Sequence, residues 1–194
     1  MLAWMSAARR LLLVLSVSIA FLAGAGDALA VGGNYVFAGG SPEAQAQVRA
    51  ALDRSTFDFD VVPEQITIRI TRCGCAGSKP GEILLDEDVL TRSPFGPRYA
   101  WGIVQDEYAH QVDFFVLEQR DRRTLQRRIG GKAWCYEISG LAHDDYGCER
   151  FSTLLAWAYW RSPDNVRRPV WPGGAGLTRP EFRALLARLL PFAA

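Results

Sequence analysis

The sequence predicts an α+β domain in which a short β-sheet packs on a largely buried central helix. Between residues 61 and 70, isoleucines alternate with polar residues, the pattern of a strand with one buried face. Apolar residues recur at helical spacing over 99–117, a run without proline that is too long for a strand. A second apolar helix is expected at about 149–160. These elements fit a single domain, residues 31–194, which is long enough to bury a core.

The first part of this domain is expected to hold the sheet and its first helix. A short strand at 35–37 precedes Ser41, which is followed by proline and opens a helix, because serine caps and proline suits the first turn. That helix is expected to end near Arg54. A second strand is expected at 82–85, after a Gly-rich loop at 73–80.

The second part is expected to be mainly helical. An arginine-rich, exposed helix at 118–128 follows the central helix. Thr178 and Glu181 have the spacing of a capping box and start a short amphipathic helix at about 178–190. The segment 162–177, rich in Pro, Gly and Arg, is expected to run over the surface.

The first thirty residues have the composition of a secretory signal peptide. Arg9 and Arg10 precede an apolar run at 11–23, and small residues lead to Ala30, where we expect cleavage. The apolar run is shorter than the roughly 20 residues of a bilayer span, which argues against a retained membrane anchor. The two arginines fit both general secretion and twin-arginine export. The sequence thus predicts a secreted or cell-envelope protein with no stable membrane anchor after cleavage.

Charge balance bears on the class of partner. The whole chain carries 22 Lys and Arg against 21 Asp and Glu, and removal of the leader leaves the mature domain close to neutral. Domains that bind nucleic acids carry an excess of basic residues on one face. We therefore expect no nucleic-acid partner.

All four cysteines lie in the mature domain, and an exported protein can form disulfides. Cys135 and Cys148 flank a short polar loop and are the expected pair. Cys73 and Cys75 are separated by one glycine, a spacing too tight to pair comfortably. A zinc-binding cysteine cluster is the weaker alternative, because the paired Cys-x2-Cys knuckles of zinc ribbons are absent.

The central helix contains the residues that carry chemistry. Asp106 and His110 are four positions apart, so their side chains project from one helical face and can share a metal ion. Glu107 is placed to take a proton from a metal-activated water. This segment resembles the active-site helix of the zincin metallopeptidases, which carries His-Glu-x-x-His. Asp106 stands where that family has its first histidine.

The resemblance covers roughly residues 61–160. It implies a small zincin-like domain, with a short β-sheet packed on an active-site helix and a second ligand-bearing helix, in which 82–85 is the edge strand. In the gluzincin branch of the family a later helix supplies a glutamate ligand, and Glu149 matches that element. The resemblance therefore implies a zinc-dependent, secreted metallopeptidase acting on a peptide or protein, with these metal ligands: Asp106, His110 and Glu149.

The aspartate has consequences for such a site. Zinc accepts Asp oxygen at about 2.0–2.2 Å, but the aspartate stem is shorter than an imidazole, so the ion or the helix must shift. Two carboxylates beside one histidine also make zinc a weaker Lewis acid. Weaker metal binding and slower hydrolysis are the expected results.

Three further residues are candidates for supporting roles. His143 and Tyr146 precede Glu149 and could donate hydrogen bonds to an oxyanion during catalysis. His143 could also replace the missing ligand, whereas the alternative for both is an ordinary polar surface loop. Asp113 is on the same face as Asp106 and is either a partner that orients His110 or a surface acid.

Two other interpretations fit the same residues. The domain could be a lapsed zincin, which keeps the fold without a catalytic metal and serves as a binding or structural domain in the cell envelope. Alternatively, the motif is a coincidence inside an unrelated, disulfide-stabilised binding domain. In that case Glu149 is only a favourable acid at a helix N-terminus and should lie well away from His110.

Overall fold

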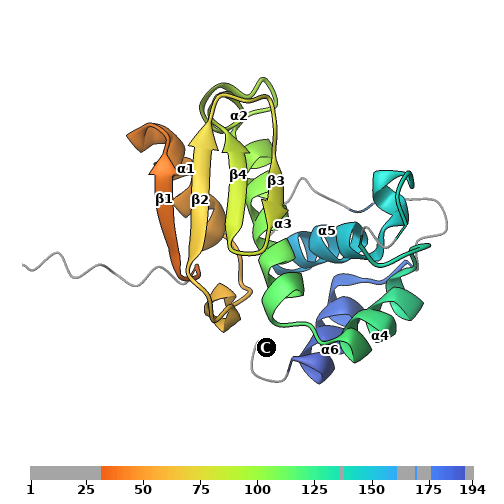
Figure 1. Ribbon diagram of the computed structural model, residues 1–194. Helices are drawn as coiled ribbons and strands as arrows, with labels where there is room; N and C mark the ends of the chain where they lie inside the picture. Colours follow the sequence, from red (N-terminus) through yellow and green to blue (C-terminus); the bar gives the residue numbers. More distant parts are fainter. Residues whose placement is uncertain (1–31, 136–137, 161–168, 170–175, 191–194) are drawn as a thin grey trace, which may run out of the picture.

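The computed structural model describes residues 32–135, 138–160, 169 and 176–190. Within these residues the chain forms six α-helices and a four-stranded mixed sheet (Figure 1), which confirms the predicted α+β class. The expected signal peptide, residues 1–30, and most of the expected surface segment 162–177 lie outside the described residues. Among the described helices, none combines the length and the apolar character that a bilayer span requires.

The sheet has the strand order β1-β2-β4-β3. The first three strands in this order run parallel, and β3 pairs antiparallel with β4 through the register Gly77↔Leu84. Their bounds are β1 Tyr35–Gly39, β2 Ile66–Thr71, β3 Gly77–Lys79 and β4 Glu82–Asp86. The β2 isoleucines are buried as expected, and each such side chain contributes about 1.5–3 kcal/mol.

The edge of the sheet differs from the sequence prediction. Residues 73–80 were expected to be loop, and 82–85 the edge strand, but the edge is β3 and β4 lies inside the sheet. The prediction was wrong because Gly-Ser-Lys has no apolar alternation and a weak preference for strands. Pairing with β4 alone makes this segment a strand.

Five of the six helices match expected ones. Their bounds are α1 Pro42–Asp53, α2 Glu87–Arg92, α3 Pro97–Phe115, α4 Gln119–Ile129, α5 Gly147–Tyr159 and α6 Arg179–Leu189. The unexpected one is α2, a short helix capped by Asp86, whose carboxylate accepts the Val89 N–H. The capping box predicted at Thr178 and Glu181 is present at the start of α6.

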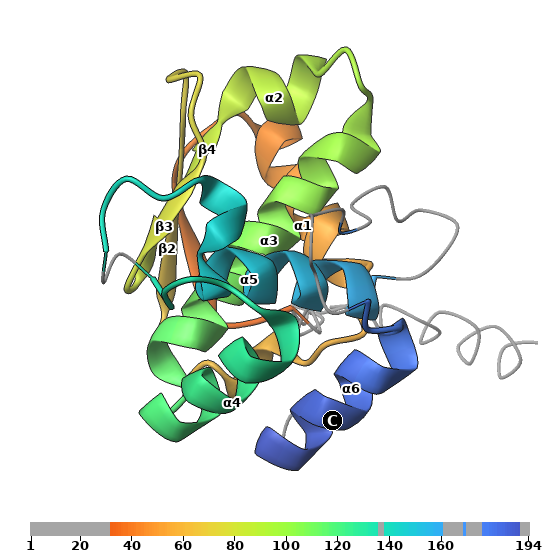
Figure 2. The ribbon, with the colours of Figure 1, turned by 90° about the vertical axis from the view of Figure 1, so that its right-hand side faces the viewer.

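Helix α3 is the central element of the fold. Helices α1 and α3 cover one face of the sheet, behind it in Figure 1 and to its right in Figure 2. Helix α5 packs against α3, and α6 and α4 pack in turn against α5. The residues of α3 that face α5 are therefore enclosed between two helices, where charged groups need partners.

Two disulfides are present. Cys135 pairs with Cys148, as the sequence predicted. Cys73 also pairs with Cys75, against the expectation that this spacing is too tight. The intervening Gly74 adopts φ +63°, which glycine tolerates without strain, and the Asp86 carboxylate accepts the Cys73 N–H at 2.8 Å. A favourable turn and a fixed carboxylate together permit the ring.

Candidate metal centre between helices α3 and α5

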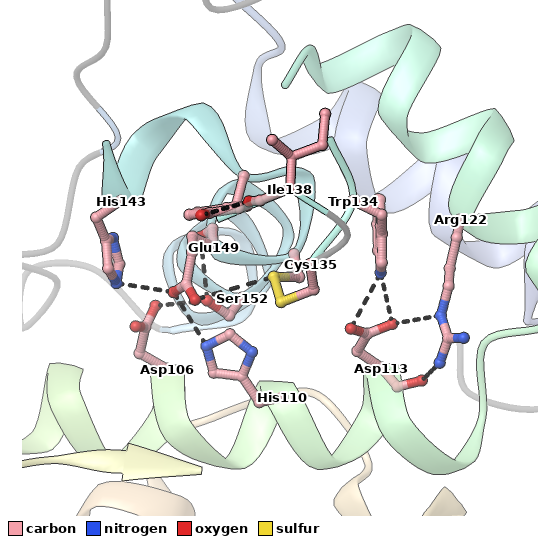
Figure 3. Close-up of a disulfide and its surroundings, with 12 residues drawn as sticks. Asp106, His110, Asp113, Arg122, Trp134, Cys135, Ile138, His143, Glu149 and Ser152 are labelled. Carbon is pink, nitrogen blue, oxygen red and sulfur yellow. Dashed lines mark hydrogen bonds and ion pairs between the residues drawn. A yellow bond between two sulfur atoms is a disulfide. The ribbon is translucent and has the colours of Figure 1, made fainter. Parts of the chain in front are cut away.

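The structure brings together the residues that the sequence singled out on two separate helices. Asp106 and His110 project from α3 toward the first turn of α5, which carries Glu149 (Figure 3). His110 Nε2 lies 3.3 Å from Glu149 Oε2, and all three side chains are buried. The interpretation as coincidence predicted a separation between His110 and Glu149, which the structure does not have.

His143 completes this arrangement from the solvent side. It begins the 3-10 turn His143–Asp145 that precedes α5, and its Nε2 lies 2.9 Å from the same Glu149 Oε2. The side chain is 75% exposed, so the ring lies at the rim of the site while its nitrogen faces inward. His143 is therefore part of the site and not a distant surface residue.

The charges of these groups are strongly coupled. Burial alone would lower the pKa of His110, but the hydrogen bond and the charge of Glu149 outweigh burial and raise it to about 9. Burial would raise the pKa of Glu149, yet hydrogen bonds from His110 and His143 outweigh it and lower the pKa to about 2. At neutral pH and without a metal ion, Glu149 is therefore an ionised carboxylate between His110 and His143, and the raised pKa of each histidine favours its protonated form.

Glu107 contacts the edge of the sheet and remains close enough to His110 and Glu149 for their charges to act on it. The Ser78 hydroxyl on β3 lies 3.0 Å from Glu107 Oε2 and 2.8 Å from the Glu107 carbonyl oxygen. The pKa of Glu107 is raised, chiefly by burial, and the nearby charges of Asp106 and Glu149 add to the increase. A raised pKa brings a carboxylate closer to the range where it exchanges protons at neutral pH.

Asp106 has a partner on α5. The Ser152 hydroxyl lies 3.3 Å from Asp106 Oδ1 and 3.1 Å from the Glu149 carbonyl oxygen, and Ser152 is fully buried. Sequence analysis missed both Ser152 and Ser78. The three-residue spacing of Glu149 and Ser152 on one helical face was a usable signal for the first. No sequence pattern marked Ser78, because its strand forms only by tertiary pairing.

The donor set fits a zinc ion. Imidazole nitrogen and carboxylate oxygen are ordinary zinc ligands, and structures place such ligands on facing helices. His110 and Glu149 already lie within contact distance, and the Asp106 carboxylate points toward them (Figure 3). No ligand atom of Asp106 lies within 4.8 Å of both, so Asp106 would have to move to bind the same ion. Because zinc binds neutral imidazole, His110 would have to lose the proton that its raised pKa favours before it could bind an ion here.

Comparisons with known proteins add no relative. No protein-family model, curated protein or solved structure matches the chain. The α+β fold and the convergence of the candidate ligands thus stand on the sequence and the structure of this chain.

Two other expected residues have different surroundings from those anticipated. The Tyr146 hydroxyl donates to the Ile138 carbonyl oxygen at 2.8 Å and accepts the Leu141 N–H, so it closes the loop before α5. Its expected role at an oxyanion stays a prediction.

Asp113 lies two turns beyond Asp106 on α3, where it faces α4 and also lies near Cys148 at the start of α5. Its buried carboxylate accepts hydrogen bonds from Arg122 Nε at 2.8 Å and Trp134 Nε1 at 3.0 Å (Figure 3). The two expected roles, orienting His110 or lying on the surface, are both replaced by this anchoring role.

Proposed function

We propose that the chain is an exported, zinc-dependent hydrolase of the zincin type that cleaves peptide bonds. The observation that carries the proposal is the contact of His110 on α3 with Glu149 on α5, 3.3 Å apart and buried. Helical spacing predicted His110 as a ligand, and the resemblance to the gluzincins implied Glu149 as a ligand of the same ion. Burying a histidine–carboxylate pair next to a second carboxylate costs folding free energy, and such buried ionisable groups are common at functional sites.

Each residue has a role in this proposal. His110, Glu149 and Asp106 hold the zinc, and His143 lies close enough to Glu149 to assist them. Zinc, when bound, polarises a carbonyl group and makes a water molecule more acidic. Glu107 accepts a proton from the attacking water and passes it to the leaving amine, a role that suits its raised pKa.

The sheet edge supports a peptide as the substrate. Strand β3 is one of the two outer strands of the sheet and carries Ser78, which contacts Glu107. The free backbone groups of an edge strand can pair with an extended peptide. A peptide paired with β3 in this way would run past Glu107, so the peptide-binding strand and the proposed general base would lie side by side.

A lapsed zincin that serves as a binding or structural domain is the second candidate. Two observations favour it. The two histidines already satisfy the Glu149 carboxylate without an ion, and Ser152 lies within hydrogen-bond distance of the shorter Asp106. Such a self-sufficient polar network can persist after metal binding is lost.

Metal analysis of the tag-free mature chain, residues 31–194, separates these candidates. The natural protein and the Asp106→His variant are purified in parallel, and zinc per chain is measured. We expect near-stoichiometric zinc in both, together with peptide hydrolysis that Glu107→Gln abolishes while zinc is retained. Zinc in the histidine variant alone would favour the lapsed zincin, and zinc in neither would overturn both readings of the site.

A further inference from the structure

A sulfur atom lies at the edge of the same site. Cys148 immediately precedes Glu149 in the first turn of α5, and its Sγ lies 3.9 Å from Glu149 Oε1. Ligand atoms of His110, Cys148 and Glu149 all lie within 4.8 Å of one another, and all three residues are buried. These three atoms are already near the spacing at which they could bind one ion.

The sulfur is blocked as a ligand by its bond to Cys135. A thiolate, not a disulfide sulfur, is the form of cysteine that binds metals. The first turn of α5, a helix of 13 residues whose positive end favours a negative charge, assists deprotonation of Cys148 after reduction, whereas burial and the Glu149 carboxylate oppose it, so we expect the thiolate to form as the metal binds. The disulfide therefore decides whether this sulfur is available.

We propose that reduction of the Cys135–Cys148 disulfide creates a thiolate metal site formed by His110, Cys148 and Glu149, selective for zinc and other thiophilic divalent ions. The inference rests on the proposed function because it uses the same histidine and glutamate. A dithiol reductant supplies two electrons: its own thiols join in a disulfide, the protein S–S bond breaks, and two protein thiols form. Metal binding then releases the Cys148 proton.

A neighbouring set of atoms is a weaker competitor. Ligand atoms of Asp113, Cys135 and Cys148 also lie within 4.8 Å of one another. The Asp113 carboxylate, however, already accepts hydrogen bonds from Arg122 and Trp134. Binding an ion there would break these bonds inside the protein, whereas the site with His110 keeps them.

A thiolate would change what the ion can do. A thiolate donates negative charge to a bound ion, whereas a disulfide sulfur donates none. The metal in the reduced protein is therefore a weaker Lewis acid. Four-coordinate zinc sites that contain cysteine are commonly structural. We therefore expect the reduced protein to hold metal more firmly and to hydrolyse peptides more slowly than the oxidised protein.

Cobalt(II) titration tests the proposal directly. The mature chain is titrated in its oxidised form and after treatment with a phosphine, which leaves no competing thiol in solution. We expect a sulfur-to-cobalt charge-transfer absorption, at one cobalt per chain, in the reduced protein alone. Cys148→Ser should lose this band, while the double variant Cys73→Ser with Cys75→Ser, the matched control, should keep it. His110→Ala should weaken cobalt binding by more than roughly 10-fold, because even the loss of a residue that only supports a ligand costs about that much.

Several results would overturn the proposal. These are the absence of the band in the reduced protein, a band of full strength in Cys148→Ser, unchanged cobalt affinity in His110→Ala, and loss of the near-UV circular dichroism spectrum on reduction. Failure of the proposed hydrolase is a separate result. It would appear as absent zinc or absent peptide cleavage in the oxidised protein, whatever the reduced protein binds.

Discussion

The buried Asp113 carboxylate makes a quantitative prediction about stability. It is 2% exposed and accepts hydrogen bonds from Arg122 Nε and Trp134 Nε1, while Arg122 Nη2 donates to the Asp113 carbonyl oxygen at 2.6 Å. Removing one partner of a buried ion pair costs about 3–5 kcal/mol, because the remaining charge is left without compensation. The Arg122 side chain is 25% exposed, so solvent reduces this cost.

We therefore expect Arg122→Met to lower the free energy of unfolding by about 2–3 kcal/mol at pH 7, measured by urea denaturation with an unchanged m-value. The exposed neighbour Arg123 supplies the control, because Arg123→Met should change the free energy by less than about 0.5 kcal/mol. Adding Asp113→Asn to Arg122→Met should recover part of the loss, since no buried charge then remains. Equal stabilities of the Arg122 and Arg123 variants would refute this account of the carboxylate.

Three further predictions concern the site and its supporting loop. Ser78→Ala should move the acid limb of the pH–rate profile to higher pH and lower kcat roughly tenfold, because the hydroxyl lowers the pKa of Glu107; an identical profile would remove Ser78 from the mechanism. Zinc affinity, measured by competition with a chromophoric chelator, should rise about tenfold per pH unit toward pH 9, where His110 loses its proton, and a flat dependence would exclude His110 as a ligand. Asp86→Asn should lower the free energy of unfolding by about 1–2 kcal/mol at pH 7, because hydrogen bonds outweigh burial and lower the pKa of Asp86 in the folded state. This difference in stability should vanish as the pH falls below 3.8. Urea unfolding at pH 7 and below pH 3.8 tests the prediction, and a constant difference would contradict it.

The sequence was sufficient where residue type and spacing act together. The alternation in β2 and the helical spacing in α3 and α5 are imposed by burial on one face, so the pattern is visible along the chain. The contact of His110 with Glu149 was anticipated on a different ground, because the resemblance to the gluzincins implied that both residues hold one ion.

The rest of the structure depends on contacts between distant segments. Strand β3 has no apolar pattern and exists because β4 offers it a partner, and α2 is too short to show a period. The roles of Ser78 and Ser152 follow from the same kind of contact, since a serine has a similar sequence context at a functional site and on a surface. The turn that holds Cys73 and Cys75 is likewise bonded to Asp86, a contact between segments that no local pattern shows.

One carboxylate oxygen of Glu149 serves two imidazoles of unequal freedom. His110 belongs to the buried face of α3 and cannot leave without moving a helix that contacts both the sheet and α5. His143 belongs to a single 3-10 turn and has most of its ring in solvent, so it can swing outward alone. His110 thus forms a fixed side of the site and His143 a movable one. We expect any ion or substrate that reaches Glu149 to enter past His143.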